Sequence, residues 1–385
     1  MELNEVSSVR DLCAQADVGI DGRRPWDIRV LDPHFYDYVV ADGSLGLGEA
    51  YMRGFWEAED LFGCISHILS CDSVTDHKNY GWRTTLAFLK ARLFNVQTIS
   101  QTRNLADTHY NLSTELFEHM LGSSMAYSCA YWKDATNLDE AQFAKYELVC
   151  RKLKLHEGER LLDIGCGWGG FCRYAAKNYG VEVVGVTVAD EQADYARRLC
   201  KGLPVDIGCR DYRKLDLAGD IGAFDKAVSI GMIEHVGTRN YRALHETVKR
   251  ALRPKGLFLL HSITSPVSTE VGEPWLTTYI FPGGVLPSIS QLSTAAEGLF
   301  LLQDMQNIGL DYMPTLLAWH ENFVEWWETA QPAGKPSIWG SQKAFYRMWR
   351  YYLLSCAAEF NVGGSHVAQL VYSNEHLPDV FIAPR

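Results

Sequence analysis

The sequence lacks the features that would place it in a membrane or outside the cell. No run of about eighteen apolar residues occurs in its 385 residues, so we expect no membrane-spanning helix. The opening residues, MELNEVSSVRDL, have no basic region followed by an apolar stretch, which argues against a secretory signal. We therefore expect a cytoplasmic protein whose thiols stay reduced.

Patterns typical of metal sites and nucleic-acid binding are missing as well. The ten cysteines form no CxxC pair and no Cys/His cluster at zinc-finger spacing, so we expect scattered core thiols and no metal site. A net charge of −11 disfavours a nucleic-acid partner, because phosphate binding needs clustered positive charge. The chain is 47% hydrophobic and 22% charged, which is typical of a compact globular protein, and its length predicts two or three domains.

The first 100 residues show short helical patterns without recognisable catalytic residues, and we expect a small helical domain there. Its segment 82–93 carries apolar residues at helical spacing, flanked by Lys90 and Arg92. Such a helix either lies on a membrane surface, where basic groups meet anionic head groups, or packs on its own domain. A polar linker is expected over residues 101–125, followed by a catalytic domain over 126–385.

The catalytic domain opens with YSCAYW, residues 127–132, which predicts either a pocket wall or a buried piece of core. Beyond residue 141, runs rich in Val, Ile and Leu alternate with helical segments. These runs are LLDIG, EVVGVTV, VDIGCRDY, FDKAVSIG and GLFLLHSI. The alternation predicts an α/β fold, with a parallel sheet covered by helices on both faces. Ligands of such sheets bind beyond the carboxyl ends of the strands.

A glycine-rich loop follows the first of these strands, in RLLDIGCGWGG at residues 160–170. It carries Gly165, Gly167, Gly169 and Gly170. Glycine lets the backbone approach a ligand closely, and the following helix offers unbonded N–H groups. The GxGxxG spacing alone also fits a dinucleotide. Asp163, just before the loop, suits an ammonium better than a pyrophosphate, so S-adenosylmethionine is favoured over NAD.

The ends of the second and third strands supply further candidates for the cofactor site. The second strand ends at Thr187 without the acidic residue that would bind the ribose of NAD. Asp190 and Gln192 lie slightly later and could bind ribose hydroxyls. Asp211 and Tyr212 follow the third strand and could bind the adenine amine and stack on the ring, unless they form an ordinary strand-end turn.

Taken together, these segments resemble the bacterial cyclopropane-fatty-acyl-phospholipid synthases, which are similar to the mycolic acid cyclopropane synthases. The matching stretches are GSLGLGEAYM (43–52), YSCAYWKDA (127–135), LLDIGCGWGG (161–170), VVGVTVADEQ (183–192), SIGMIEHVG (229–237), FLLHSI (258–263) and YYLLSCAAEF (351–360). The resemblance implies a class I S-adenosylmethionine-dependent methyltransferase fold, Rossmann-like, behind the helical N-terminal domain. It also adds Tyr127 and Ser128 to the expected cofactor-binding residues.

The resemblance implies that the sulfonium methyl becomes a methylene bridge across the cis double bond of a phospholipid acyl chain. The alkene is a weak nucleophile, so the donor must be held close and in line. Methyl transfer leaves a carbocation, which must lose a proton to a base before the ring closes. In the family this base is a bound bicarbonate ion, and its holders here would be Cys129, Glu234, His261, Ile263 and Tyr312.

The resemblance also points to Cys356, because a cysteine in the matching late helix was long treated as catalytic in this family. Cys356 shares one helical face with Phe345, Trp349, Tyr352 and Leu353, which favours a buried structural thiol. Methyl transfer to an alkene needs no covalent enzyme intermediate. The catalytic role of Cys356 is therefore contested from the start.

Residues 264–299 form an insertion after the fifth strand, in which four prolines exclude one long helix. We expect it to cover the site and line an acyl-chain channel, the alternative being an irregular surface excursion. The resemblance further implies unsaturated phospholipid as partner at the inner face of the membrane, where the enzyme would be peripheral, and a homodimer. Two other hypotheses stay open: methylation of a small amine or lipid head group, and lipid binding without catalysis.

Overall fold

The structure is a computed structural model that describes residues 3–71, 114–215, 222–330 and 336–385. The chain divides into two compact units, which are considered separately. The helical unit comprises Met1–Phe94, Val271–Pro282 and Met313–Gly364. The sheet unit comprises Asn95–Glu270, Gly283–Tyr312 and Ser365–Arg385.

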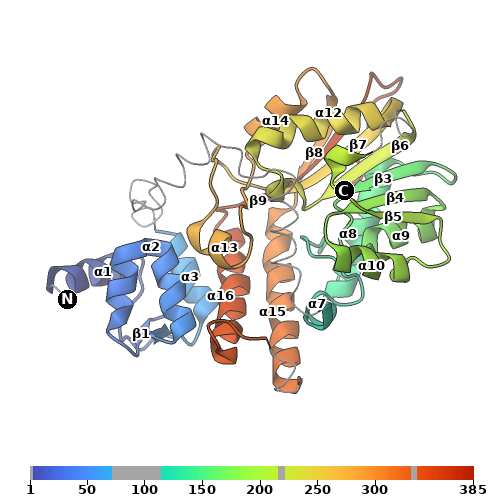
Figure 1. Ribbon diagram of the computed structural model, residues 1–385. Coiled ribbons are helices and arrows are strands. Elements are labelled where there is room, and N and C mark those ends of the chain that lie inside the picture. Colours follow the sequence, from blue (N-terminus) through green and yellow to red (C-terminus); the bar gives the residue numbers. More distant parts are fainter. Residues whose placement is uncertain (1–2, 72–113, 216–221, 331–335) are drawn as a thin grey trace. The chain divides into compact units, whose positions relative to one another are not determined.

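The sheet unit is built on a seven-stranded sheet in the order β5-β4-β3-β6-β7-β9-β8 (Figure 1). Its strands are β3 (Arg160–Ile164), β4 (Glu182–Thr187), β5 (Val205–Cys209), β6 (Phe224–Ile230), β7 (Leu252–Thr264), β8 (Leu301–Asn307) and β9 (His366–Ser373). The five expected strands, β3 to β7, are parallel. This confirms the predicted parallel sheet, which two further strands extend: β9 pairs antiparallel with both β7 and β8.

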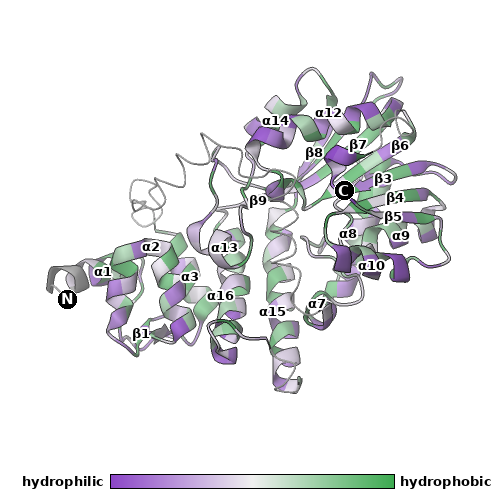
Figure 2. Ribbon diagram, viewed as in Figure 1, coloured by the Kyte–Doolittle hydropathy of each residue, from purple (hydrophilic) through white to green (hydrophobic). Residues whose placement is uncertain are grey.

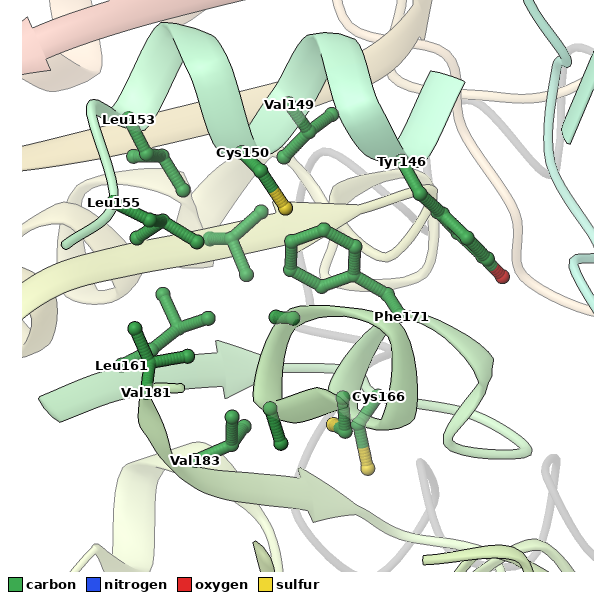
Figure 3. Packing of buried hydrophobic residues seen from close by; sticks show 14 of the residues in the cluster. Tyr146, Val149, Cys150, Leu153, Leu155, Leu161, Cys166, Phe171, Val181 and Val183 are labelled. Atoms are coloured by element: carbon green, nitrogen blue, oxygen red, sulfur yellow. The ribbon is translucent and has the colours of Figure 1, made fainter. Parts of the chain in front are cut away.

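Helices cover both faces of this sheet, as the α/β pattern predicts. Helices α8 (Leu138–Leu153), α9 (Gly170–Tyr179) and α10 (Asp190–Leu199) lie on one face; α12 (Tyr241–Ala251) and α14 (Ile289–Ala296) lie on the other. On the first face, Val149 and Cys150 of α8 meet Phe171 of α9 above Leu161 of β3 (Figure 3). Figure 2 shows the same arrangement as hydropathy, with mainly hydrophobic strands and a hydrophilic outer helix α10. One hydrophobic core lies on each face of the sheet. Burying each large apolar side chain stabilises the fold by about 1.5–3 kcal/mol, so these two cores hold the strand ends in place.

Short polar signals start the helices that flank the site. Asn137 caps α8 by accepting a hydrogen bond from the Glu140 N–H, and Ser288 forms a capping box with Gln291 at the start of α14. Each cap satisfies a backbone donor that the helix itself leaves unbonded. The remaining short elements are α7 (Thr114–Leu121) and the 3-10 turns η2 (Tyr212–Lys214), η3 (Ile233–His235), η4 (Thr238–Asn240) and η5 (Gly309–Asp311).

The helical unit joins segments that are distant in the sequence. It contains α1 (Leu3–Gln15), β1 (Arg29–Val30), α2 (His34–Arg53), β2 (Trp56–Glu57), α3 (Leu61–Leu69), α13 (Pro274–Tyr279), α15 (Tyr312–Thr329) and α16 (Gln342–Asn361). A side chain at Gly48 of α2 would lie within 2.3 Å of the Trp275 ring of α13, so glycine is required for this close packing. The buried Arg347 of α16 donates hydrogen bonds to the backbone carbonyls of Tyr51 and Trp56.

These units differ from the expected domain boundaries. The helical unit extends beyond residues 1–100, because residues 271–282 and 313–364 cluster with it. The insertion 264–299 is divided between the two units, and α7 occupies part of the expected linker 101–125. The amphipathic segment 82–93 lies outside the described residues.

Within the described residues, no helix combines the length and the apolar composition needed to cross a membrane. The ten cysteines all lie in the described part of the chain, and no disulfide joins any two of them.

Candidate active site

The glycine-rich loop connects β3 to α9 and bends sharply at three glycines. Gly165, Gly167 and Gly169 all have positive φ angles, of 85°, 52° and 82°. The N–H groups of Gly165 and Cys166 donate to the Val186 carbonyl of β4, which holds the loop against the sheet. A side chain at Gly165 would collide with Met232, whereas one at Gly167 would point into open space. The bare backbone at Gly167 is therefore the part of the loop that a ligand can approach.

Asp163 is buried at the end of β3 and already has a protein partner. Its Oδ2 accepts a hydrogen bond from the Cys172 thiol of α9 over 3.2 Å. Burial raises the pKa of the Asp163 carboxyl to about 7, and the bond from Cys172 partly opposes this rise. A nearby ammonium would favour the charged carboxylate. The contact between Asp163 and a ligand ammonium remains a prediction.

The other expected cofactor residues lie at the carboxyl ends of β4 and β5. Thr187 Oγ1 donates to Gln192 Oε1 over 2.9 Å, and both side chains are buried. Asp211 caps the η2 turn and pairs with Arg213, whose Nη2 lies 2.6 Å from Asp211 Oδ2. The Tyr212 hydroxyl is buried and has no hydrogen-bond partner among the described residues. The structure thus brings the predicted ribose and adenine residues to neighbouring strand ends.

Glu234 lies in η3, directly after β6, and is buried there. Its Oε1 accepts the Ile263 N–H of β7 over 2.7 Å. Its Oε2 is buried without a hydrogen-bond partner in the described structure. Burial raises the pKa of this carboxyl to about 7, against the opposing hydrogen bonds from the backbone of Glu234 and Ile263 and from Ser262. An unmet buried carboxyl oxygen of this kind points to a ligand or an ordered water.

His261 lies on β7, two residues before Ile263, and is held neutral. Burial, followed by the positive charges of Lys145 and Lys152, keeps the pKa of its imidazole well below the ordinary value. Gln369 of β9 is its cross-strand partner, and the amide Nε2 lies 3.3 Å from His261 Nδ1. This contact holds the imidazole ring against β9.

Cys129 and Tyr312 reach the same end of the sheet through the segment after β8. The buried Cys129 thiol lies 3.6 Å from the Ile308 carbonyl oxygen. The Ile308 N–H donates to the Val367 carbonyl of β9, and Val367 pairs with Ile263 of β7. Tyr312 follows four residues after Ile308 and is also buried. The contact between Cys129 and Ile308 thus joins residues that are 179 positions apart in the chain, and β9 links Ile308 to β7.

The Cys129 sulfur is held as a thiol. Burial and the Asp311 carboxylate raise the pKa of Cys129 well above its ordinary value, and Lys145 opposes this shift. A thiol can donate a hydrogen bond but is a poor nucleophile. At neutral pH Cys129 can therefore act as a hydrogen-bond donor, and the Ala130 carbonyl oxygen accepts from it over 3.2 Å in this structure.

Cys356 belongs to the other compact unit. All five expected base-binding residues lie in the sheet unit, whereas Cys356 lies in α16 of the helical unit. Its side chain is only partly buried, unlike the neighbouring Trp349 and Leu353 on the expected helical face. Burial of the sulfur, with Glu359 and Glu273 nearby, raises the pKa of the Cys356 thiol. These surroundings disfavour the thiolate that a nucleophile would require.

Two buried polar residues of α8 escaped the sequence reasoning. Lys145 donates to Ser128 Oγ over 2.8 Å, and Gln142 donates to the Ser128 carbonyl over 2.9 Å. Both side chains are fully buried. They are three positions apart and share a helical face, so a polar stripe inside an otherwise apolar helix was the available signal.

The site can hold a small oxyanion beside a nucleotide-like cofactor. The Cys129 thiol, the neutral His261 imidazole and a protonated Glu234 can each donate a hydrogen bond to an oxyanion. The open backbone at Gly167 and the start of α9 suit the cofactor.

The chain matches the family model described as mycolic acid cyclopropane synthetase over residues 97–370. It is 43% identical over 364 residues to the cyclopropane-fatty-acyl-phospholipid synthase of Escherichia coli (strain K12), covering 94% of this chain and 92% of the relative. It is also 35% identical over 281 residues to cyclopropane mycolic acid synthase 3 of Mycobacterium tuberculosis, covering 68% of this chain and 93% of the relative.

Solved structures are similar to this chain in fold. A mycolic acid cyclopropane synthase in complex with SAH and CTAB superposes with a TM-score of 0.62 at 31% identity, covering 70% of this chain and 98% of that one. A coclaurine N-methyltransferase bound to N-methylheliamine and SAH has a TM-score of 0.69 at 21% identity, covering 86% and 99%, and at this identity shows the fold alone. The fold of the sheet unit is that of a Rossmann-like, class I S-adenosylmethionine-dependent methyltransferase.

Proposed function

This chain belongs to the mycolic acid cyclopropane synthetase family, and we propose that it cyclopropanates unsaturated phospholipids. It transfers a methylene group from S-adenosylmethionine to the cis double bond of an acyl chain. The observation that carries this function is the 43% identity to a cyclopropane-fatty-acyl-phospholipid synthase along nearly the whole length of both chains. The activity is therefore that of a methyltransferase acting on carbon.

S-adenosylmethionine, when bound, supplies an electrophilic methyl group. We propose that the loop at Gly165, Gly167 and Gly169 and the strand-end residues Asp163, Thr187, Gln192, Asp211 and Tyr212 hold it, together with Tyr127 and Ser128. The positive φ angles and the open backbone at Gly167 support the loop assignment. Close, oriented binding matters because an isolated alkene reacts poorly with an electrophile.

The acyl chain must also lose a proton from its new methyl group before the ring can close. We propose that bicarbonate is the base and that Cys129, Glu234, His261, Ile263 and Tyr312 hold it. The buried, unmet Oε2 of Glu234 and the neutral state of His261 support this assignment. Bicarbonate, when bound, supplies a weakly basic oxygen that accepts a proton. Hydrogen-bond donors on this chain orient that oxygen. The same residues present no stronger nucleophile that could add to the carbocation.

The setting of the reaction is also a proposal. Phospholipid acyl chains stay in the bilayer, so we propose that the enzyme works in the cytoplasm as a peripheral protein at the inner face of the membrane. We propose that residues 264–299 line the acyl-chain path and that the protein is a homodimer. Sedimentation at several concentrations tests the homodimer, and flotation with phospholipid vesicles tests the association with the membrane.

Mass spectrometry of lipids tests the proposed reaction. Purified protein is incubated with S-adenosylmethionine and vesicles of an unsaturated phospholipid, and intact lipids and released acyl chains are both weighed. We expect a gain of one CH2 per modified acyl chain together with loss of the double bond. A gain on the head group with the alkene intact would assign the protein to head-group methylation instead, and no gain on any unsaturated lipid would leave only lipid binding.

A further inference from the structure

A buried lysine without a counter-ion lies beside the proposed base site. Lys145 of α8 is fully buried, and its Nζ donates a hydrogen bond to Ser128 Oγ. An ammonium group has three N–H donors and no acceptor. In the described structure this Nζ forms no ion pair with any carboxylate. Lys145 is thus a buried ammonium that could bind an anionic ligand.

The position of Lys145 relates it to two proposed ligands of the base. Ser128, its hydrogen-bond partner, is the neighbour of Cys129 in the chain. The charge of Lys145 acts on the Cys129 thiol and also on the His261 imidazole of β7. The charge of Lys145 therefore affects the pKa values of both Cys129 and His261.

The burial of the Lys145 ammonium favours the binding of an anion beside it. A lone ammonium in a dry interior is costly unless an anion neutralises it. Burial lowers the pKa of Lys145 to about 7, so its charge is easily lost without a partner. Glu234 forms no ion pair with Lys145 in the described structure, and burial, which raises the pKa of its carboxyl to about 7, disfavours its charged form. A singly charged oxyanion bound beside Lys145 would leave the buried site neutral.

We propose that Lys145 is a positioning residue that holds the anionic base by supplying the positive charge of its site. The ligand class is a small oxyanion, and bicarbonate is the one that the proposed function requires, so this inference rests on that function. Its ammonium acts directly or through the Ser128 hydroxyl, and no bond is made or broken at Lys145 itself.

A purely structural role would look different. Lys145 and Gln142 both bond to Ser128, so Lys145 could serve only as an anchor for the segment before α8. An anchor needs a hydrogen-bond donor, whereas an anion site needs a charge. Lys145→Gln keeps a donor and removes the charge; Lys145→Met removes both at nearly the same length.

Lys152 provides a matched control on the same helix. Its side chain is equally buried, but its Nζ has the Asp304 carboxylate at 3.5 Å, and Arg385 also pairs with Asp304. Lys152→Met therefore removes a buried lysine that already has its anion. It reports the general effect of losing a buried lysine from α8.

The first measurement is the melting temperature against sodium bicarbonate, at constant ionic strength with sodium chloride and at pH 7.5. We expect bicarbonate to raise the melting temperature of the wild type and of Lys152→Met. Lys145→Met and Lys145→Gln should need at least tenfold more bicarbonate for the same rise. Without bicarbonate, Lys145→Met should melt no lower than the wild type, because it replaces a buried polar group that has no carboxylate partner with an apolar side chain of similar length.

The second measurement is methylene transfer in bicarbonate-depleted buffer as bicarbonate is restored. Both Lys145 variants should show the same tenfold shift in half-saturation, with cofactor affinity unchanged. A wild-type response in either variant would overturn the proposal; in Lys145→Gln alone, it would establish the anchor role. If the wild type forms product without any bicarbonate response in either measurement, the role of Lys145 is overturned while the methylene transfer stands.

Discussion

Two buried cations, one in each unit, show how differently the two regions use polar groups. Arg347 in the helical unit meets the carbonyls of Tyr51 and Trp56 and lies over the Tyr51 ring, 3.9 Å from its centroid. Lys145 in the sheet unit lies over the Tyr146 ring, 4.7 Å from its centroid, and donates to the Ser128 hydroxyl, but no backbone carbonyl or carboxylate accepts from it in the described structure. Arg347 joins α16 to the end of α2 and to β2, because both carbonyls that it meets lie there. At the strand ends of the sheet unit, incomplete bonding marks the place for ligands.

The comparison predicts that changes at the strand ends affect catalysis more than stability. Glu234→Ala should lower kcat by about 10²–10⁴-fold, the range typical for a group that serves proton transfer. Affinity for the cofactor should change little, because Glu234 lies after β6 and the glycine loop after β3. Turnover by lipid mass spectrometry and cofactor affinity by calorimetry check this.

The control for that experiment is Glu234→Gln, which keeps an acceptor for the Ile263 N–H. Equal losses of turnover and of cofactor affinity in both variants would assign Glu234 to folding or cofactor capture.

Changes at Arg347 should show the opposite pattern. Arg347→Met removes the side-chain donors to the Tyr51 and Trp56 carbonyls and the stacking on the Tyr51 ring, and we expect the free energy of unfolding of the helical unit to fall by about 2–4 kcal/mol. Cofactor binding by the folded protein should be unchanged, because the glycine loop belongs to the sheet unit. Urea unfolding followed by tryptophan fluorescence measures the loss.

Lys is the matched replacement at this position, since Arg347→Lys keeps the charge and one donor and should lose less stability. Weaker cofactor binding at full folding would break the separation between the two regions.

The pKa of Glu234 predicts a pH dependence of stability. Its folded value of about 7 lies above the ordinary value of 4.5, so its contribution is complete below pH 4.5 and is lost as the pH rises through 7. Relative to Glu234→Gln, the wild type should lose about 2–3 kcal/mol of unfolding free energy across that interval. Denaturant titrations from pH 4.5 to 8 test the sign and the size.

Asp163→Asn offers an independent check, because burial also raises the Asp163 pKa to about 7. Its difference from the wild type should have the same sign. A wild-type protein that gains stability relative to both variants as the pH rises would contradict the assigned burial effects.

The smallest effect is expected at Cys356. Because its thiol pKa is raised and it lies in the helical unit, Cys356→Ala should change kcat by no more than about threefold and stability by about 1 kcal/mol. Steady-state kinetics measure the change in kcat, with Cys129→Ala for comparison, and urea unfolding measures the change in stability. A loss at Cys356 as large as at Cys129 would restore the catalytic interpretation of the late helix.

Much of the sheet unit could be predicted from local patterns. The runs of Val, Ile and Leu located β3 to β7, and the glycines located the loop, because periodicity and backbone freedom are properties of neighbouring residues. The family resemblance, which the comparisons confirm, supplied the roles of Glu234 and His261. Their positions after β6 and on β7 agree with the rule that ligands meet parallel sheets at the carboxyl ends of strands.

The remaining features depend on contacts between distant segments. The antiparallel β9 and the membership of residues 313–364 in the helical unit could not be read from periodicity, since strand partners are chosen by tertiary packing. Tertiary packing also decides that the Cys172 thiol is the partner of Asp163 and that Lys145 has no carboxylate partner in the described structure. A lysine in a helical pattern is usually solvated, and only burial shows otherwise.

By itself, the sequence determined the type of fold, the cofactor loop and the family, because all three follow from residue types at fixed spacings. The tertiary structure alone decided which polar groups are buried and which of those lack a partner. That distinction sets charge and pKa, since the cost of burying a charge depends on every surrounding segment. It separates Arg347, whose guanidinium meets two backbone carbonyls, from Lys145, whose ammonium meets one hydroxyl, and from Glu234, whose Oε2 has no hydrogen-bond partner in the described structure.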